Sequence, residues 1–233
     1  PAPAADSYLS VPRLLEAAKR SGADAVHPGY GFLSESALLA AACESSGLIF
    51  VGPPATVIAD MGSKIGARAL MESSGVPVVP GETPDDQSET GLRRAIDRVK
   101  LPALLKASAG GGGKGMRLVR HESEIGDAIQ AARREATAAF GDGTLYVERL
   151  LGRPRHVEVQ IFGDHHGRIV HLFERECSVQ RRHQKVIEES PSPALTPALR
   201  ARMTAAAVKA AKAAGYRNAG TIEFLIEGAG DNA

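Results

Sequence analysis

The pattern of apolar and polar positions divides the chain into alternating helices and strands. In the first 77 residues, apolar spacings of three and four predict helices at 7–19, 34–45 and 63–75, with Ser34 as the N-cap of the second. Short apolar runs predict buried strands at 24–27 and 48–52. Alternation of strand and helix is typical of an α/β unit with a parallel sheet, and we expect residues 1–77 to form one.

The pattern changes after a connector rich in proline and acidic residues, 78–90. Helices are predicted at 88–99 and 122–139, strands at 102–108 and 116–119, and an extended segment at 144–151. Residues 78–150 are therefore predicted to be a small α+β domain or lid. Residues 155–177 then alternate with a period of two around an Asp-His-His-Gly turn, which predicts a β-hairpin. A helix at 196–214 and a strand at 220–227 complete a third region, 151–233.

Composition and charge narrow the function classes. Lys and Arg total 28 against 27 Asp and Glu, a formal net charge of +1, which argues against a nucleic-acid-binding protein. The two cysteines, Cys43 and Cys177, make no disulfide framework in a chain of 233 residues, and favour a reduced, intracellular setting. No apolar run reaches the ~18 residues of a membrane span.

A glycine-rich loop is the first candidate for chemistry. Residues 106–116, KASAGGGGKGM, place five glycines at 110–115, interrupted only by Lys114, between two predicted strands. A flexible linker is the simpler interpretation. A backbone that must lie directly on phosphate oxygens needs glycine for another reason, because a Cβ would block the approach. The P-loop pattern does not fit, because Ser108 stands in place of its first Gly and Gly115 in place of its Ser or Thr. The Rossmann loop requires a helix directly after it, where a strand is predicted, so the pattern favours a lid over a nucleotide.

A second candidate is the charged stretch 173–190, FERECSVQRRHQKVIEES. It could be an ordinary solvated edge strand. Its interleaved Arg, Lys, His and Glu residues are also suited to an anion site with acid–base groups, in which cations neutralise a small oxyanion.

Six motifs, in order and spacing, resemble those of biotin carboxylases, which are ATP-grasp ligases. They are HPGYGFLSE (27–35), MGSK (61–64), KASAGGGGKGM (106–116), VERLLGRPRHVEVQ (148–160), ERECSVQRRHQK (174–185) and GTIEFL (220–225). The resemblance implies a partial N-terminal parallel α/β domain, with the start of the ATP-grasp fold, in 1–77. An ATP-grasp lid in 78–150 and a truncated catalytic subdomain in 151–233 would follow, with the C-terminal part missing.

The same resemblance implies roles for individual residues. The nucleotide site would comprise Lys64, Lys106, Gly110, Gly111, Gly112, Gly113, Lys114, Gly115, Met116, Glu148, Leu151 and His156. Lys64 and Lys106 would hold phosphates, and Glu148 with Leu151 would form the adenine-facing hinge. Lys106, Gln180, His183 and Lys185 would be the catalytic residues, the last three around bicarbonate and carboxyphosphate. Glu223 would be the first of two carboxylates that hold Mg²⁺ or Mn²⁺.

The implied reaction is ATP-dependent carboxylation of carrier-bound biotin with bicarbonate, through carboxyphosphate, for a biotin-dependent acyl-CoA carboxylase. Its implied partners are a biotin carboxyl carrier protein or domain, a carboxyltransferase subunit and a second copy in a homodimer, with neither nucleic acid nor membrane. The compartment would be cytoplasmic, or the mitochondrial matrix in a eukaryote.

The chain departs from the family pattern at both ends. The family's first strand and turn, and the strand that carries the second acidic metal ligand with an Asn and an Arg, are not in this sequence. We therefore expect a fragment that is inactive alone. Two alternatives stay open: another ATP-grasp ligase, such as a carbamoyl-phosphate synthetase half, and a nucleotide-binding module without catalysis.

Overall fold

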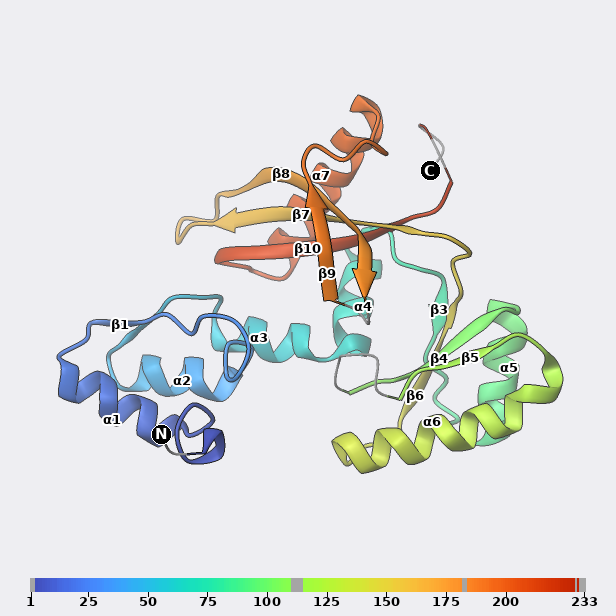
Figure 1. Cartoon of the computed structure of the whole chain (residues 1–233), viewed down its shortest axis with the longest axis horizontal. Helices are drawn as coiled ribbons and strands as arrows, with labels where there is room; N and C mark the ends of the chain where they lie inside the picture. The colour runs from blue at the N-terminus through green and yellow to red at the C-terminus, as the bar shows by residue number, and fades with distance from the viewer. Residues whose placement is uncertain (1–2, 110–114, 182–183, 229, 231–233) are drawn as a thin grey trace.

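The computed structural model describes residues 3–109, 115–181, 184–228 and 230. The described residues form separate sheets that follow one another along the chain, each with its own helices (Figure 1). No helix in these ranges is both long enough and apolar enough to cross a membrane.

The first sheet pairs β1 (Ala25–Val26) and β2 (Ile49–Phe50) in parallel, as predicted. Around it lie η1 (Ala4–Asp6), α1 (Val11–Ser21), α2 (Ala37–Ser45) and α3 (Ala55–Gly62). Its core contains the buried residues Leu39, Ala40, Cys43, Phe50 and Ile58. The α/β unit is therefore confirmed, and α3 is an additional helix that the apolar pattern did not predict.

The N-cap of α2 differs from the prediction. Ser36, not Ser34, has the extended backbone of a cap, and its side chain accepts a hydrogen bond from the Leu39 amide. Ser34 instead lies in a turn, where its amide donates to the Gly31 carbonyl. A cap must lie at the point where helical dihedral angles begin, and two nearby serines cannot be distinguished by residue type alone.

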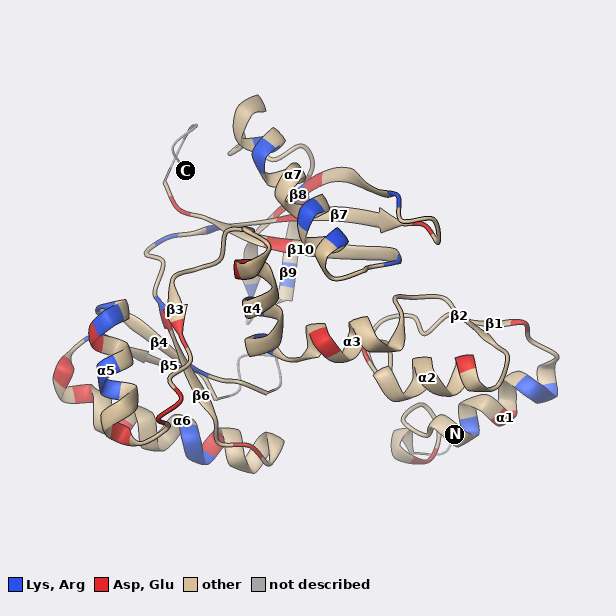
Figure 2. Ribbon diagram, turned by 180° about the vertical axis from the view of Figure 1, so that it is seen from behind, with Lys and Arg blue, Asp and Glu red and all other residues tan. Residues whose placement is uncertain are grey.

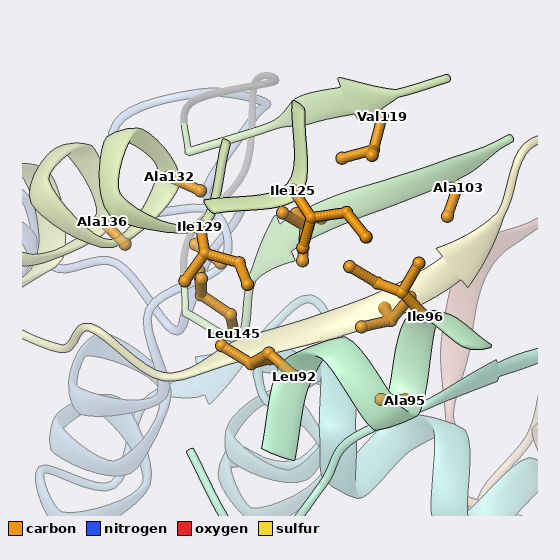
Figure 3. Packing of buried hydrophobic residues seen from close by; sticks show 13 residues of the cluster. Leu92, Ala95, Ile96, Ala103, Val119, Ile125, Ile129, Ala132, Ala136 and Leu145 are labelled. Atoms are coloured by element: carbon orange, nitrogen blue, oxygen red, sulfur yellow. The ribbon is translucent and has the colours of Figure 1, made fainter. Parts of the chain in front are cut away.

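The second sheet has the strand order β3-β6-β4-β5. Its elements, with the helix α4 that leads into it, are α4 (Lys64–Ser73), β3 (Gly81–Glu82), α5 (Glu89–Val99), β4 (Ala103–Ala107), β5 (Arg117–Val119), η2 (Glu122–Glu124), α6 (Ile125–Phe140) and β6 (Leu145–Arg149). Side chains of α5 and α6 converge on β4 and β6 and close a core that contains Leu92, Ile96, Ile125 and Ile129 (Figure 3). The strands on either side of the glycine loop pair antiparallel, as predicted.

The third sheet has the order β10-β7-β8-β9, with antiparallel neighbours throughout. Its elements are β7 (Arg155–Gly163), β8 (Ile169–Arg181), β9 (Gln184–Glu189), α7 (Pro197–Ala213) and β10 (Asn218–Ile226). The predicted hairpin is β7–β8. Apolar residues of β7 and β10, Val157, Val159, Ile161 and Ile226, pack against α7. One face is thus buried by α7, and the other face is left for polar chemistry.

Charged residues of both signs are interspersed along the chain, for example on α5 (Figure 2). The segment between β6 and β7 joins the second and third sheets. Glu227, just after β10, anchors this segment by accepting hydrogen bonds from Arg149 and from the Gly152 amide, each at 3.0 Å.

Candidate functional site

Lys64 is the first residue of α4. The Ser63 side chain caps this helix by accepting a hydrogen bond from the Gly66 amide at 3.1 Å. From that position the Lys64 side chain reaches β4, where its Nζ donates to the Ala107 carbonyl at 3.4 Å. The cap therefore fixes the point from which the lysine extends toward the second sheet.

Lys106 lies on β4, at a half-buried position between two buried neighbours. Its register partner on β6 is Tyr146, and its Nζ lies 5.8 Å from the centroid of that ring. The Nζ also forms an ion pair with Glu148, also on β6. The two side chains of this pair are only 22% and 12% exposed, so the pair is largely shielded from water.

The electrostatics of this group favour an anion. Burial lowers the pKa of Lys64, and the nearby Lys106 ammonium lowers it further, while Glu148 opposes the shift. Two ammonium groups are therefore near one carboxylate, which forms its ion pair with Lys106. A polyphosphate bound there would relieve the repulsion between the lysines. We call Lys64, Lys106 and Glu148 the lysine cluster.

Gly110 to Gly113 and Lys114 lie outside the described residues, but the end of the glycine loop is described. Gly115 has φ +69°, and an added Cβ would lie 3.0 Å from the Cβ of Ala107. Both features require glycine at this position. Met116, half-buried, follows it, and its carbonyl accepts a hydrogen bond from Arg117. The loop therefore returns to the sheet directly beside β4, next to Lys106.

A second group lies on the open face of the third sheet. Glu158 of β7 is in register with Arg175 of β8 on one side and with Glu223 of β10 on the other. Lys185 of β9 forms an ion pair with Glu158, and its Nζ lies 3.3 Å from Glu223 Oε1. Arg175 contacts Glu158 from the other side at 2.6 Å. Adjacent strands thus bring residues far apart in sequence onto one face.

Glu158 is the centre of this group. Its side chain is 3% exposed, and burial alone would raise its pKa. Hydrogen bonds from Lys185 and Arg175 outweigh burial and lower the pKa, so the carboxylate stays charged. The same ion pair raises the pKa of Lys185 against the opposing effect of its burial.

His156 and Gln180 complete the group. His156 Nε2 lies 3.5 Å from Glu223 Oε1, and the Gln180 amide nitrogen contacts His156 Nδ1. The same amide nitrogen donates to the Cys177 carbonyl at 2.8 Å, which orients it. His183, also predicted for this site, lies outside the described residues. We call His156, Glu158, Arg175, Gln180, Lys185 and Glu223 the carboxylate cluster.

The carboxylate cluster contains donors suited to a divalent cation. Ligand atoms of His156, Glu158 and Glu223 lie within 4.8 Å of one another. Carboxylate oxygens are what Mg²⁺ prefers, and it needs only one or two of them when phosphates supply the rest. Glu158 is already held by Arg175 and Lys185, whereas the Glu223 side chain is 58% exposed. Glu223 therefore fits the metal best.

Leu151 lies between the two sheets. It is buried, in the segment that runs from β6 to β7. The preceding residues of this segment are fixed to the second sheet's surroundings: the Arg149 amide donates to the Pro80 carbonyl, and the Leu150 amide to the Pro102 carbonyl. The backbone that follows Glu148 in the predicted hinge is thus held by hydrogen bonds to Pro80 and Pro102.

Comparison with known families accounts for nearly the whole chain. Residues 63–232 match the family described as carbamoyl-phosphate synthase L chain, ATP binding domain. The chain belongs to this ATP-binding family. Residues 1–58 match the biotin carboxylase N-terminal domain, and this pairing of domains confirms the resemblance to biotin carboxylases.

Relatives of this ATP-binding chain are similar along its length. Biotin carboxylase of Halalkalibacterium halodurans is 53% identical over 229 residues, which is 97% of this chain and 50% of the relative. The mitochondrial methylcrotonoyl-CoA carboxylase subunit alpha of Dictyostelium discoideum is 53% identical over 226 residues, 97% of this chain and 32% of the relative. The chain thus spans about a third to a half of the length of these proteins.

Solved structures show the same fold. The Campylobacter jejuni biotin carboxylase–beta-gamma-ATP complex superposes with a TM-score of 0.90 at 44% identity, over 94% of this chain and 49% of that one. The biotin carboxylase domain dimer of Hydrogenobacter thermophilus 2-oxoglutarate carboxylase, in complex with MgADP, ADP and bicarbonate, has a TM-score of 0.88 at 44% identity, with the same shares covered. The ATP-grasp architecture is therefore confirmed.

Sequence reasoning did not predict two residues of the carboxylate cluster, Glu158 and Arg175. Arg175 was noticed only as part of a charged stretch. The signal that could have found Glu158 is its position: an acidic residue between Val157 and Val159, in a strand whose neighbouring positions pack on α7. A charge so close to a core requires a partner across the sheet.

Proposed function

We propose that this chain is the nucleotide- and bicarbonate-binding part of a biotin carboxylase. In the full-length protein, ATP would phosphorylate bicarbonate to carboxyphosphate, and the CO₂ released from it would carboxylate carrier-bound biotin. The observation that carries the proposal is that an anchored segment connects β6, which contributes to a lysine cluster with one positive charge in excess, to β7, which contributes to a carboxylate cluster.

The lysine cluster would bind the nucleotide phosphates. Lys64 and Lys106 would contact the phosphate oxygens, and the loop of Gly110 to Gly115 with Lys114 and Met116 would close over them. Phosphoryl transfer depends on positioning and on neutralising charge, and two converging ammonium groups supply both. Glu148 and Leu151 would lie beside adenine, and His156 beside the ribose or phosphates.

The carboxylate cluster would orient bicarbonate. Lys185, with Gln180 and His183, would hold the anion in line with the γ-phosphate, because a weak nucleophile reacts only when its geometry is fixed. Glu158 would keep Lys185 charged and in place. Glu223 would bind Mg²⁺ or Mn²⁺, which when bound would neutralise charge on the phosphates.

We further propose that the full-length protein acts with a biotin carrier and a carboxyltransferase, forms a homodimer, and is located in the cytoplasm or the mitochondrial matrix. We also propose domain boundaries near residues 77 and 150. Relatives named as subunits of methylcrotonoyl-CoA carboxylase and pyruvate carboxylase support the idea of a multi-component enzyme.

The test is ATP cleavage by the full-length protein, measured as ADP release with and without bicarbonate and free biotin. We expect ADP release to require bicarbonate and to rise with biotin. Release that instead depends on ammonia would favour a carbamoyl-phosphate synthetase activity. Tight ADP binding without turnover under any of these conditions would favour a nucleotide-binding module.

A further inference from the structure

The first residues of β7 lie beyond the regular ladder that joins β7 to β8. Backbone pairing between these strands runs from Gly163–Ile169 to Val157–Glu176. Arg155 and His156 precede that pairing, at the end of the strand. His156, a member of the carboxylate cluster, therefore has no register partner on β8 and must be held on that side by other contacts.

The Ser178 side chain takes the place of a backbone hydrogen bond between the end of β7 and β8. Ser178 Oγ accepts a hydrogen bond from the His156 amide at 3.0 Å. The same hydroxyl donates to Glu176 Oε1 at 2.9 Å. A hydroxyl that donates in one direction and accepts in the other has a fixed orientation, so the Ser178 acceptor is aimed at His156.

Glu176 is in turn held from several sides. It is buried, with a relative exposure of 5%. Its Oε1 also accepts from Arg155 at 2.7 Å, and its Oε2 accepts from Ser192 Oγ at 2.6 Å. Burial would raise the pKa of Glu176, but the hydrogen bonds from Ser192, Ser178 and Arg155 lower it. This carboxylate therefore ties the end of β7 to β8 and to the segment before α7.

We propose that Glu176 and Ser178 are positioning residues that hold the Arg155–His156 end of β7, and through it the His156 imidazole, in place for the nucleotide. Glu176 holds Arg155 by its side chain, and Ser178 holds His156 by its backbone amide. The link to the nucleotide rests on the proposed function. Neither residue touches the reacting groups.

The proposal predicts a specific effect of Ser178→Ala in the full-length protein. Ser178 is exposed, so the substitution leaves no cavity in the core. Loss of one neutral hydrogen bond corresponds to about a threefold to tenfold change in an equilibrium. We expect KM for ATP to rise by about that factor with kcat within about twofold, and Ser178→Thr, which keeps the hydroxyl, to restore KM.

Hydrogen exchange of the His156 amide in the ligand-free protein gives a readout that does not depend on activity. Ser178→Ala is expected to speed its exchange by about the same factor. Ser190→Ala is the matched control, because it removes a serine hydroxyl that donates to the Glu174 carbonyl at 2.8 Å and has no contact with His156. The control should leave both the exchange rate and KM unchanged.

Two results would overturn the positioning role: unchanged exchange at His156 in Ser178→Ala, or equal effects of Ser178→Ala and Ser190→Ala. Failure of the proposed function looks different. In that case the wild type cleaves no ATP with bicarbonate, while the exchange measurement still decides whether Ser178 holds the His156 backbone.

Discussion

The lysine cluster and the carboxylate cluster differ in how their buried charges are balanced. In the first, Glu148 is paired with Lys106 and leaves the charge of Lys64 unbalanced, and burial together with the nearby Lys106 ammonium lowers the pKa of Lys64. In the second, Glu158 and Glu223 face Arg175 and Lys185, so the formal charges of these four side chains cancel, and Arg175 also pairs with Glu188 at 3.7 Å. The lysine cluster therefore favours binding of an anion, whereas the charged side chains of the carboxylate cluster hold one another in place.

This difference sets what each ligand must do. A polyphosphate supplies the charge that the lysine cluster lacks, and it would compete with Glu148 for Lys106. A ligand of the carboxylate cluster meets groups that already have partners, so it would have to exchange contacts, foremost that between Lys185 and Glu223. We therefore expect substitution of Lys64 or Lys106 to change affinity for the nucleotide and substitution of Lys185 to change turnover.

The largest effect is expected from Lys185→Gln in the full-length protein. Removing one charged donor to a developing oxyanion typically costs about 10²- to 10³-fold in turnover. Bicarbonate-dependent kcat should fall by about that factor, with KM for ATP within about twofold, as measured by steady-state ADP release. Lys209→Gln, in which the lost lysine donates to the Gly75 carbonyl, is the control and should leave both parameters near wild type. A tenfold rise in KM for ATP in Lys185→Gln would erase the distinction between the clusters.

Lys106→Ala should act on affinity. Loss of a charge-assisted contact of about 1.5–3 kcal/mol corresponds to roughly 10- to 150-fold weaker nucleotide binding, measured by calorimetry. Because the substitution also leaves Glu148 without its ion-pair partner, the double variant Lys106→Ala/Glu148→Ala is needed. If the double variant binds as tightly as wild type, the loss in the single variant came from the unpaired Glu148, and Lys106 does not contact phosphate.

Local patterns predicted the elements of both regions well. The period-two alternation at 155–177 became β7 and β8, and the strands beside the glycine loop paired as expected. Such patterns depend on neighbours a few residues apart. The short helix α3 was missed because its eight residues, between Pro54 and Ser63, are too few to show a clear apolar period.

Contacts between distant residues were less predictable. Lys106 meets Glu148, 42 positions later, only because β4 and β6 pair in one register. Similarly, Glu158 on β7 contacts Lys185 on β9, with β8 lying between these two strands in the third sheet. Single residue types do not encode register. Family motifs placed Lys106, Glu148 and Lys185 near a site, but only the paired strands show which charges compensate each other.

The free energy of unfolding at acidic pH should show how much the charge of Glu158 stabilises the carboxylate cluster. The lowered pKa of Glu158 means that its carboxylate contributes stability above the unfolded value of 4.5, and that this contribution is lost as pH falls through the lower folded pKa. Glu158→Gln should lower stability near neutral pH by about 1–3 kcal/mol, below the ~3–5 kcal/mol of a fully buried pair, because Arg175 and Lys185 can hydrate.

Urea unfolding of the full-length protein from pH 7 to pH 3 checks this expectation. The wild type and Glu158→Gln should converge as pH falls below 4.5, because the wild type loses the same interaction. Exposed Glu44→Gln serves as the control, with little change at either end. A constant difference between wild type and Glu158→Gln across the whole range would show that the charge of Glu158 is not what stabilises the cluster.

The smallest effect concerns how Lys64 is presented. Ser63→Ala removes the cap of α4 and should cost about 1 kcal/mol of stability. It should also weaken nucleotide binding severalfold, because Lys64 begins the helix whose first turn frays. Ser88→Ala removes an equivalent cap from α5, which presents no cluster residue, and should cost similar stability with unchanged binding. Equal binding losses in the two variants would mean that general loosening of the second sheet, rather than the placement of Lys64, controls affinity in the lysine cluster.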